Sequence, residues 1–262
     1  PGNHLTLIPE QGTDEDETSK VNLMLRSAST TPDVLSLPTA PIGAMGAAGY
    51  LQPLNSYVAH WDKWSQFPPA IQQESAFNGQ IYGVNTGNND CGLLYSRPLF
   101  KKAGLPVSWT PHTWADIITA ARAIKKNSPK VHPFFMMAGK ANGAITVLQG
   151  AGNLLVGAKQ PTIYDGKTGK WVARSSGLLD LFQFIHTMSS EGLLGPTGDV
   201  FTPQIFTPLL NVWLRNQKYA MAVACNWMPA TWLGPLYGGV TWPQAKSVWG
   251  AVGMPTAPHT LL

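Results

Sequence analysis

The chain has 262 residues, 44% of them hydrophobic and 10% aromatic, which is enough apolar material for two compact lobes and excludes global disorder. Charged residues make up only 12%, about half the usual quarter, so Ser, Thr, Asn, Gln, Gly and Pro must form much of the surface. The net charge is +4, but the basic residues are scattered instead of clustered among aromatics, which argues against a nucleic-acid-binding protein.

The first ninety residues predict short elements separated by prolines and glycines. A weak alternation predicts a strand at 4–8, and the apolar run at 33–37 has the profile of a buried parallel strand. Helices are expected at 18–27 and at 42–48. An Asn-Gly pair between apolar flanks predicts a β-hairpin within 77–84.

The remaining residues alternate strand and helix signals more regularly. Residues 93–95 predict a short buried strand, and the clearest helix begins after Thr113, with Asp116 as the partner in a capping box. A second hairpin is expected at 164–171 and a helix at 177–190, capped by Ser175 or Ser176. That helix is expected to bury Leu178, Leu181, Phe182, Ile185 and Met188, and a further short helix is expected from Pro208 with Thr207 as its cap. This alternation predicts an α/β architecture with mostly parallel sheets.

The two cysteines, Cys91 and Cys225, fit neither a disulfide framework nor the spacing of metal ligands. A single long-range disulfide between them is compatible with the sequence, but we expect two buried thiols. Residues 1–17 contain no apolar segment of the kind that a signal peptide requires. Two long uncharged windows, 34–61 and 219–245, are interrupted by prolines, so they predict buried strands and cleft loops, not membrane spans.

The sequence contains no motif of a common catalytic or cofactor site. It has no Gly-x-Ser-x-Gly elbow, Walker A loop or zincin motif, and residues 150–155 lack the third glycine of a dinucleotide loop. The six histidines are dispersed, and none is spaced from Cys or Glu as a metal ligand would be. We therefore expect no catalytic residue, no metal site and no cofactor.

A glycoside hydrolase is the main enzymatic alternative, because tryptophan-rich clefts often hold sugars. Such an enzyme needs two carboxyl groups across one glycosidic bond. Acidic side chains such as Asp116, Asp165 and Asp180 are expected at a cap, a turn and a helix surface. Asp90 instead lies in an uncharged segment rich in Asn and Gly, next to a predicted strand, which favours a hydrogen-bonding ligand site over a catalytic pair.

Several short motifs follow one another in a characteristic order along nearly the whole chain. They are Pro32-Asp33-Val34-Leu35, the segments 47–54 and 78–84, Asp90-Cys91-Gly92-Leu93-Leu94-Tyr95, the run 97–106, Thr113-Trp114, the segments 182–194 and 213–221, and Asn226-Trp227. None is specific by itself. Their order and spacing resemble the extracellular solute-binding proteins of ABC sugar importers, in solute-binding family 1, of the maltose/trehalose-binding type.

The resemblance implies an α/β, two-lobed, type II periplasmic-binding-protein fold with the ligand cleft between the lobes. It places a first lobe at residues 1–90, a second lobe at 91–250, and a second hinge with a return toward the first lobe at 251–262. Proteins of this kind bind a sugar, close by hinge motion and deliver it to a permease. Family members are longer, so the resemblance also implies that this chain is truncated at both ends and that its first lobe is incomplete.

The chain departs from the family pattern at positions that bear on the ligand. Pro38 and Pro41 stand where the family often has Asp and Trp. Asn142 stands at a usual glutamate, and Gln217 replaces the glycine of a common signature. Two frequent acidic sugar ligands are thus absent, which leaves the identity of the sugar open.

The expected site combines a carboxylate, amides and aromatic rings. The expected ligand-binding residues are Asp90, Trp227, Asn226, Asn89, Asn142, Thr39 and Trp232. Asp90 would accept hydrogen bonds from two sugar hydroxyls, and Trp227 would stack on the apolar face of a pyranose. Their structural alternatives are a turn-capping aspartate and a core tryptophan, and asparagine serves turns and ligands equally well. Trp232 is expected to form a wall of the site.

The resemblance predicts non-catalytic binding of a carbohydrate, a di- or oligosaccharide, and its delivery to the permease subunits of an ABC importer. The alternatives are a secreted glycoside hydrolase or other sugar-active enzyme, a structural or adhesion module, and binding of an anionic sugar derivative such as a glycerophosphodiester. We expect a monomer outside the cytoplasm, in the periplasm or as a cell-surface lipoprotein, with its export signal lost before Pro1. Membrane contact is expected only through that lost lipid anchor or the permease.

Overall fold

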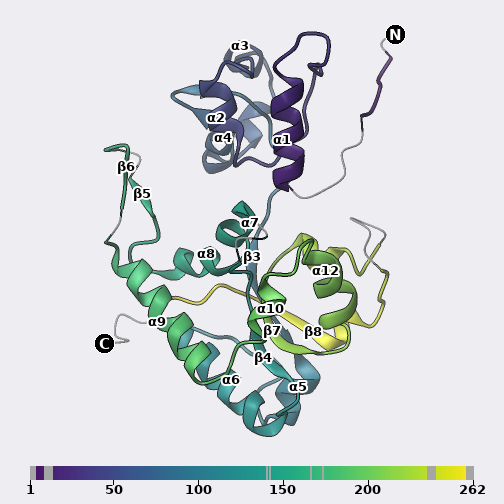
Figure 1. Ribbon diagram of the computed structural model, residues 1–262, viewed down its shortest axis with the longest axis vertical. Helices are drawn as coiled ribbons and strands as arrows, with labels where there is room; N and C mark the ends of the chain where they lie inside the picture. The colour runs from purple at the N-terminus through teal and green to yellow at the C-terminus, as the bar shows by residue number, and fades with distance from the viewer. Residues whose placement is uncertain are drawn as a thin grey trace. The chain divides into compact units, whose positions relative to one another are not determined.

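The computed structural model describes residues 4–8, 14–139, 141, 143–165, 167–172, 174–234 and 240–257. The contacts within the chain divide it into two compact units, Pro1–Asn88 and Asn89–Leu262. In Figure 1 the first unit runs from purple to blue, and the second continues through teal and green to yellow.

The first unit consists of short helices and one small hairpin. Its elements are α1 (Asp14–Met24), α2 (Ile42–Ala47), α3 (Asn55–Ala59), the 3-10 turn η1 (Trp64–Gln66), α4 (Pro69–Glu74), β1 (Ala76–Phe77) and β2 (Gln80–Ile81). The helix expected at 42–48 is confirmed as α2, whereas the one expected at 18–27 begins earlier, as α1. The Asn-Gly hairpin is also confirmed, because Asn78 and Gly79 both have positive φ, 49° and 76°, as a type I′ turn requires.

Two strands expected in the first unit are wrong. Residues 4–8 and 33–37 form no regular element, and some of their apolar side chains face solvent: Leu5 is 84% exposed and Val34 86%. An apolar run becomes a strand only where a neighbouring strand accepts and donates its backbone hydrogen bonds. In the described part of this unit, β1 and β2 pair with each other, and neither run joins them.

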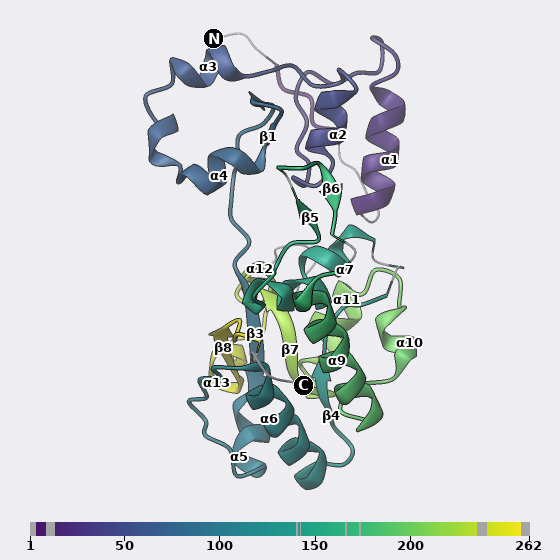
Figure 2. The same ribbon diagram turned by 90° about the vertical axis from the view of Figure 1, so that its left-hand side faces the viewer.

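The second unit is built on a four-stranded sheet of order β4-β7-β3-β8 (Figure 2). The strands are β3 (Cys91–Ser96), β4 (His132–Phe135), β7 (Tyr219–Cys225) and β8 (Trp249–Gly253). β3 is antiparallel to both β7 and β8, and only β4 and β7 are parallel among these four described strands. The expected mostly parallel sheet is therefore wrong. An apolar run indicates that a strand is buried on both faces, but it does not indicate the direction of the strand. An antiparallel strand covered by helices on both sides is buried in the same way as a parallel one.

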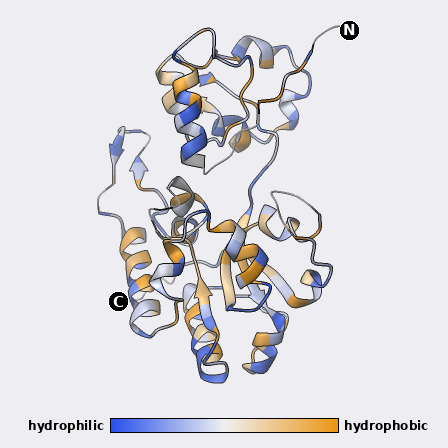
Figure 3. Ribbon diagram, turned by 45° about the vertical axis from the view of Figure 1, so that its right-hand side comes forward, coloured by the Kyte–Doolittle hydropathy of each residue, from blue (hydrophilic) through white to orange (hydrophobic). Residues whose placement is uncertain are grey.

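Helices cover both faces of this sheet. They are α5 (Arg97–Lys102), α6 (Trp114–Asn127), α7 (Ala144–Leu148), α8 (Ala151–Leu154), α9 (Ser176–Ser190), α10 (Thr197–Val200), α11 (Phe206–Pro208), α12 (Trp227–Ala230) and α13 (Ala245–Val248), with the turns η3 (Leu155–Gly157) and η4 (Leu209–Trp213). One core joins α6 and α9 to Leu93 and Val223, and the other joins η4 and α12 to Leu94 and Ala224. Successive strand residues face opposite sides, so β3 and β7 supply both cores. Figure 3 shows hydrophobic and hydrophilic colouring alternating along the helices.

The later helices follow the sequence with two corrections. The helix expected at 177–190 is confirmed as α9, with Ser175 as its cap. Phe182 is wrong as a core residue: it is 62% exposed, and Phe184 is buried instead, on the stripe of α9 that faces α6 and the sheet. The short helix expected from Pro208 is present, but it begins at Phe206, so Thr207 lies inside α11 instead of capping it, and the chain continues as the π-helix η4.

The expected hairpin at 164–171 is confirmed. Its strands are β5 (Tyr164–Asp165) and β6 (Lys170–Trp171), in which Tyr164 pairs with Trp171 and Asp165 with Lys170. The Asp165 carboxylate accepts hydrogen bonds from the backbone N–H of Lys167 and the hydroxyl of Thr168 (2.9 and 2.8 Å), so it stabilises the turn. These bonds, led by the one from the Thr168 hydroxyl, lower the pKa of Asp165.

The capping box of α6 forms as expected. Asp116 Oδ2 accepts hydrogen bonds from the backbone N–H groups of Thr113 and His112, at 2.9 and 2.8 Å. These bonds, led by the one from Thr113, hold the pKa of Asp116 below its ordinary value. The first residue of α6 also ties the helix to the chain after β8, because the backbone and indole N–H groups of Trp114 donate to the carbonyl oxygens of Thr256 and Pro255 (3.0 and 3.1 Å).

A polar cluster fixes the beginning of β7. Asp199 Oδ2 of α10 accepts hydrogen bonds from Lys218 Nζ and from the Tyr219 hydroxyl, each 2.5 Å long. Burial by itself would raise the pKa of Asp199, but the bonds from Lys218 and Tyr219 lower it overall. Burial, together with the neighbouring Asp199, raises the pKa of Tyr219. The cluster therefore anchors α10 to the sheet.

We expect Asp116→Ala to lower the free energy of unfolding by about 1 kcal/mol, the usual cost of losing a helix cap. Because the pKa of Asp116 is depressed in the folded chain, its contribution is present above the ordinary carboxyl pKa of about 4 and is lost as the pH falls through the depressed value. Urea unfolding of both proteins between pH 7 and pH 3 measures the difference. A stability difference that stays constant below pH 4 would contradict this account.

Candidate functional site

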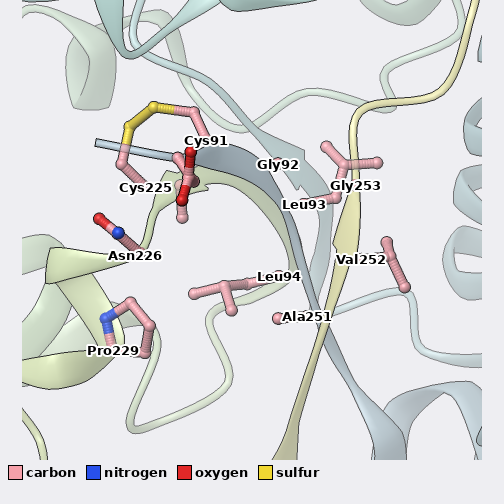
Figure 4. Close-up of a pocket in the computed structure, with 12 residues that line it drawn as sticks. Cys91, Gly92, Leu93, Leu94, Cys225, Asn226, Pro229, Ala251, Val252 and Gly253 are labelled. Atoms are coloured by element: carbon pink, nitrogen blue, oxygen red, sulfur yellow. A yellow bond between two sulfur atoms is a disulfide. The ribbon is translucent and has the colours of Figure 1, made fainter. Parts of the chain in front are cut away.

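The candidate site is a pocket of about 290 Å³ at one end of β3, β7 and β8 (Figure 4). It is lined by Asp90, Cys91, Gly92, Leu93, Leu94, Ala224, Cys225, Asn226, Pro229, Ala251, Val252 and Gly253. All of these residues belong to the second unit. The volume is just below the range of small-molecule sites, which begins at about 300 Å³.

The most polar side chains of the pocket come from positions that adjoin paired strand ends. Asp90 directly precedes β3, and Asn226 directly follows β7. The backbone N–H of Asn226 donates a hydrogen bond to the carbonyl oxygen of Asp90 (2.9 Å), and both residues are exposed. Asp90 and Asn226 form the rim of the pocket. A carboxylate accepts hydrogen bonds, and an amide both donates and accepts them, so this rim suits a ligand that carries hydroxyl groups.

A disulfide closes the sheet beside this rim. Cys91 and Cys225 lie directly opposite each other on β3 and β7 and are covalently joined, as Figure 4 shows. The expectation of two buried thiols is therefore wrong. The cysteines are 134 residues apart, and only the antiparallel pairing of the two strands brings them together.

The wall of the pocket opposite β7 depends on glycines. A Cβ atom at Gly92 would clash with the carbonyl oxygen of Val252 on β8, and one at Gly250 would clash with the ring of Tyr95 on β3. Neither neighbour can move cheaply, because one is backbone and the other is a buried ring. These two glycines therefore permit the close approach of β3 and β8 that forms this wall.

Trp227 lies one residue beyond the rim and is the first residue of α12. Its indole N–H donates to Gln149 Oε1 (3.1 Å), and its ring packs edge-on against Phe206 with centroids 4.8 Å apart. The residue is half-buried and does not line the pocket. Contact between Trp227 and a ligand stays a prediction.

A second pocket of about 220 Å³ adjoins the first. The two share Leu94, Asn226, Pro229 and Ala251. Trp232 and Lys246 line the second pocket only. The indole of Trp232 is 1% exposed and donates to the carbonyl oxygen of Leu210 (3.1 Å). Its role in the site stays a prediction.

Asn89 and Thr39 lie outside both pockets. Asn89 is exposed beside Asp90, and Thr39 is exposed in the first unit. Asn142 lies outside the described residues. The structure thus brings Asp90 and Asn226 together, and roles for Asn89, Thr39 and Asn142 stay predictions.

Sequence reasoning missed most of the pocket wall. Pro229, Ala251 and Gly253 carry small or apolar groups that no motif distinguishes from core residues. Their position depends on the pairing of β3 with β7 and β8, which a single sequence does not reveal. The cysteine pair was the available signal, because each cysteine lies at one end of an apolar run.

Within the part of the chain that the structure describes, no group of three or more His, Cys, Asp or Glu side chains is arranged to hold a metal ion. No helix among the same residues has the length and apolar character needed to cross a membrane.

The fold is similar to those of several solved solute-binding proteins. The one from Thermotoga lettingae TMO, bound with α-D-tagatose, gives a TM-score of 0.74 at 19% identity and covers 93% of this chain and 58% of its own. Maltose-bound T. maritima MalE3 gives 0.72 at 18% identity, covering 96% and 59%, and the protein from Agrobacterium radiobacter K84 in complex with ribitol gives 0.71 at 18%, covering 94% and 58%. This chain therefore spans less than two thirds of the length of these proteins.

At such identities the similarity shows the fold, and it confirms the expected α/β fold of the two-lobed periplasmic-binding type. The family described as "Bacterial extracellular solute-binding protein" matches residues 2–258. Since that match covers nearly the whole chain, the chain belongs to the bacterial extracellular solute-binding protein family.

Proposed function

We propose that this chain binds a carbohydrate or polyol outside the cytoplasm, without converting it, and delivers it to the permease of an ABC importer. The observation that carries the proposal is the family match over residues 2–258, which includes residues of both units. The solved proteins of similar fold that hold tagatose, maltose and ribitol support a ligand rich in hydroxyl groups.

The chemistry of the pocket supports the same class of ligand. The carboxylate of Asp90 and the amide of Asn226 lie on the rim, whereas Leu94 and Pro229 supply apolar walls. A sugar presents hydroxyl groups at its edge and C–H groups on its faces, so it needs both kinds of surface. Hydrogen bonds from hydroxyls to a carboxylate contribute about 1.5–3 kcal/mol each.

Binding is favoured over hydrolysis by the number of carboxylates. A glycoside hydrolase places two carboxyl groups about 5–9.5 Å apart across the scissile bond. Among the described residues that line the two pockets, Asp90 is the one with a carboxylate. The pocket therefore offers a hydrogen-bonding acceptor but no acid–base pair of the usual kind.

An anionic sugar derivative, such as a glycerophosphodiester, is the second candidate. Lys246 lines the adjoining pocket, whose wall includes Asn226 of the rim. A ligand that extended from one pocket into the other would bring a phosphate toward this cation. Over residues 18–262 the chain also carries 18 basic against 9 acidic side chains, which favours anions over long range.

The proposed location is the periplasm or the cell surface, where the protein would be a monomer, with a lipid anchor as one means of attachment. The family description places such proteins outside the cell. The disulfide between Cys91 and Cys225 supports this location, because disulfides persist mainly in oxidising compartments. The permease subunits would be the protein partner.

The function is tested by titration calorimetry of the purified chain with maltose, trehalose, cellobiose, ribitol and glycerophosphocholine. We expect saturable binding of at least one of these compounds and no product in the mixture after prolonged incubation. Release of glucose from any disaccharide would contradict the proposal. Preference for the phosphodiester would select the second candidate.

Replacing the charge at the rim should weaken binding without unfolding the chain. We expect Asp90→Asn to reduce affinity about 5- to 150-fold, or about 1–3 kcal/mol, because the amide keeps the shape and one acceptor but loses the charge that strengthens bonds from hydroxyls. Calorimetry measures the affinity and thermal unfolding the stability. Asp33→Asn, which alters an exposed carboxylate of the first unit, is the matched control and should bind as the wild type does.

Two substitutions at Trp227 distinguish a ring that stacks on the ligand from a ring that only packs in the core. Trp227→Phe keeps a ring but loses the N–H that donates to Gln149, whereas Trp227→Ala loses both. If the ring stacks on the ligand, we expect a loss of tenfold or more in affinity for the alanine variant and a smaller loss for the phenylalanine variant. Trp171→Ala removes an indole that is 74% exposed and lies outside the pockets, so it serves as the control. A lower melting temperature with unchanged affinity in Trp227→Ala would identify a core tryptophan instead.

A further inference from the structure

The two polar rim residues lie where the regular structure ends. Cys91 and Cys225 form the terminal pair of the β3–β7 ladder, and Asp90 and Asn226 are the next residue on each strand. The residues that lead to Asp90, from 82 to 90, form neither helix nor strand. Among the described residues, the regular structure next to Asp90 is the strand that follows it.

Both antiparallel ladders of β3 end here. The pairing of β8 with β3 reaches only Gly92, opposite Gly253, so among the described strands Cys91 has a neighbour on the β7 side alone. Beyond that pair, the backbone hydrogen bond from Asn226 to Asp90 joins two exposed residues. The ends of a ladder open more readily than its centre, because fewer buried contacts oppose the opening.

The disulfide lies at this end of the β3–β7 ladder and not in its middle. The other residues of β3 and β7 pair over four further positions, from Gly92 opposite Ala224 to Tyr95 opposite Met221. Apart from Gly92, these residues belong to the two apolar cores, so the sheet has strong support without the covalent link. The effect of the disulfide therefore falls mainly on the pocket rim.

We propose that the Cys91–Cys225 disulfide is a positioning element of the binding site: it fixes Asp90 and Asn226 relative to each other, so ligand affinity depends on its oxidation state. The inference rests on the proposed function of the same pocket. A rim ordered before the ligand arrives avoids the entropic cost of ordering it during binding. Cys91 and Cys225 touch the pocket, but the hydrogen-bonding groups that they position belong to their neighbours.

The disulfide would be reduced by ordinary thiol–disulfide exchange. A thiolate of an external dithiol attacks one sulfur, the Cys91–Cys225 bond breaks, and the second thiolate of the dithiol then resolves the mixed disulfide. In balance, the protein disulfide gains two electrons and two protons to become two thiols, and the dithiol becomes a cyclic disulfide. An oxidising compartment keeps the protein in the bridged form.

The test compares the oxidised wild type, the same protein reduced with dithiothreitol, and the double variant Cys91→Ala/Cys225→Ala. Maltose is the calorimetric probe, or whichever compound of the panel above binds best. We expect affinity to fall about tenfold in the reduced and double-variant proteins, the factor that corresponds to reordering the backbone of about one residue during binding. Dithiothreitol should have no effect on the double variant, which controls for the reagent itself.

Met221→Ala is the matched control for stability. Met221 is buried on β7 and lies opposite Tyr95, at the other end of the same ladder, so its truncation loosens the packing of these strands away from the rim. We expect this variant to melt at a lower temperature and to bind with unchanged affinity. Wild-type affinity in the double variant would overturn the proposal, whatever its melting temperature.

Hydrogen exchange at the Asn226 amide provides a readout that needs no ligand. This N–H donates to Asp90, so we expect at least tenfold faster exchange when the disulfide is absent, while the central amides of β7 keep their protection. If no compound binds to any form, the proposed function fails and exchange alone decides the positioning role. Equal protection of the Asn226 amide with and without the disulfide would overturn it.

Discussion

The structure of the second unit depends on the two antiparallel ladders that β3 makes with β7 and with β8. These ladders bring three segments, distant in the chain, to one end of the sheet, where they supply most of the pocket. The ladder between β3 and β8 leaves no room for a side chain at Gly92 or Gly250. The distance between these strands is therefore set by contact of Gly92 with the backbone of Val252 and of Gly250 with the ring of Tyr95. The pocket is thus a by-product of strand pairing, and its polar groups are the first residues beyond the paired ends.

β7 is fixed at both of its ends by different means. At its beginning, Asp199 holds Lys218 and Tyr219 in a partly buried polar cluster. At its end, Cys225 is bonded to Cys91, and the chain continues into Asn226 and α12. The position of the rim follows from a strand that cannot slide along its neighbours, since a shift by one residue would break both attachments and turn each side chain to the opposite face.

The features that were predicted correctly are those that neighbouring residues in the sequence determine. The capping box at Thr113, the Asn-Gly turn at 78–79 and the Ser175 cap of α9 all depend on residues within four positions of one another, and all three are present. The predictions that failed concern pairing over long distances. None of the described strands pairs with the run 33–37, and the direction of the sheet strands depends on chain crossings that apolar periodicity does not record.

The predictions for the site also divide into those that succeeded and those that failed. Family resemblance placed Asp90 and Asn226 in the site, and the structure shows that they share one pocket rim. It did not provide the disulfide, because the cysteines carry no motif, nor the small residues of the wall. On α9, Phe182 and Phe184 are both apolar and two positions apart, and only the helix rotation against the sheet determines which one is buried.

The disulfide also closes a covalent ring that contains β3, β4 and β7, with β8 outside it. The hairpin β5–β6 lies within this ring and extends away from α8 and α9 in Figure 1, with Trp171 largely exposed. Such an exposed hairpin is a natural place for a protease to cut. A chain nicked there would remain one molecule, because both fragments carry a half of the cystine and a strand of the same sheet. Proteolysis at this hairpin would consequently leave the two pieces covalently joined and the pocket assembled.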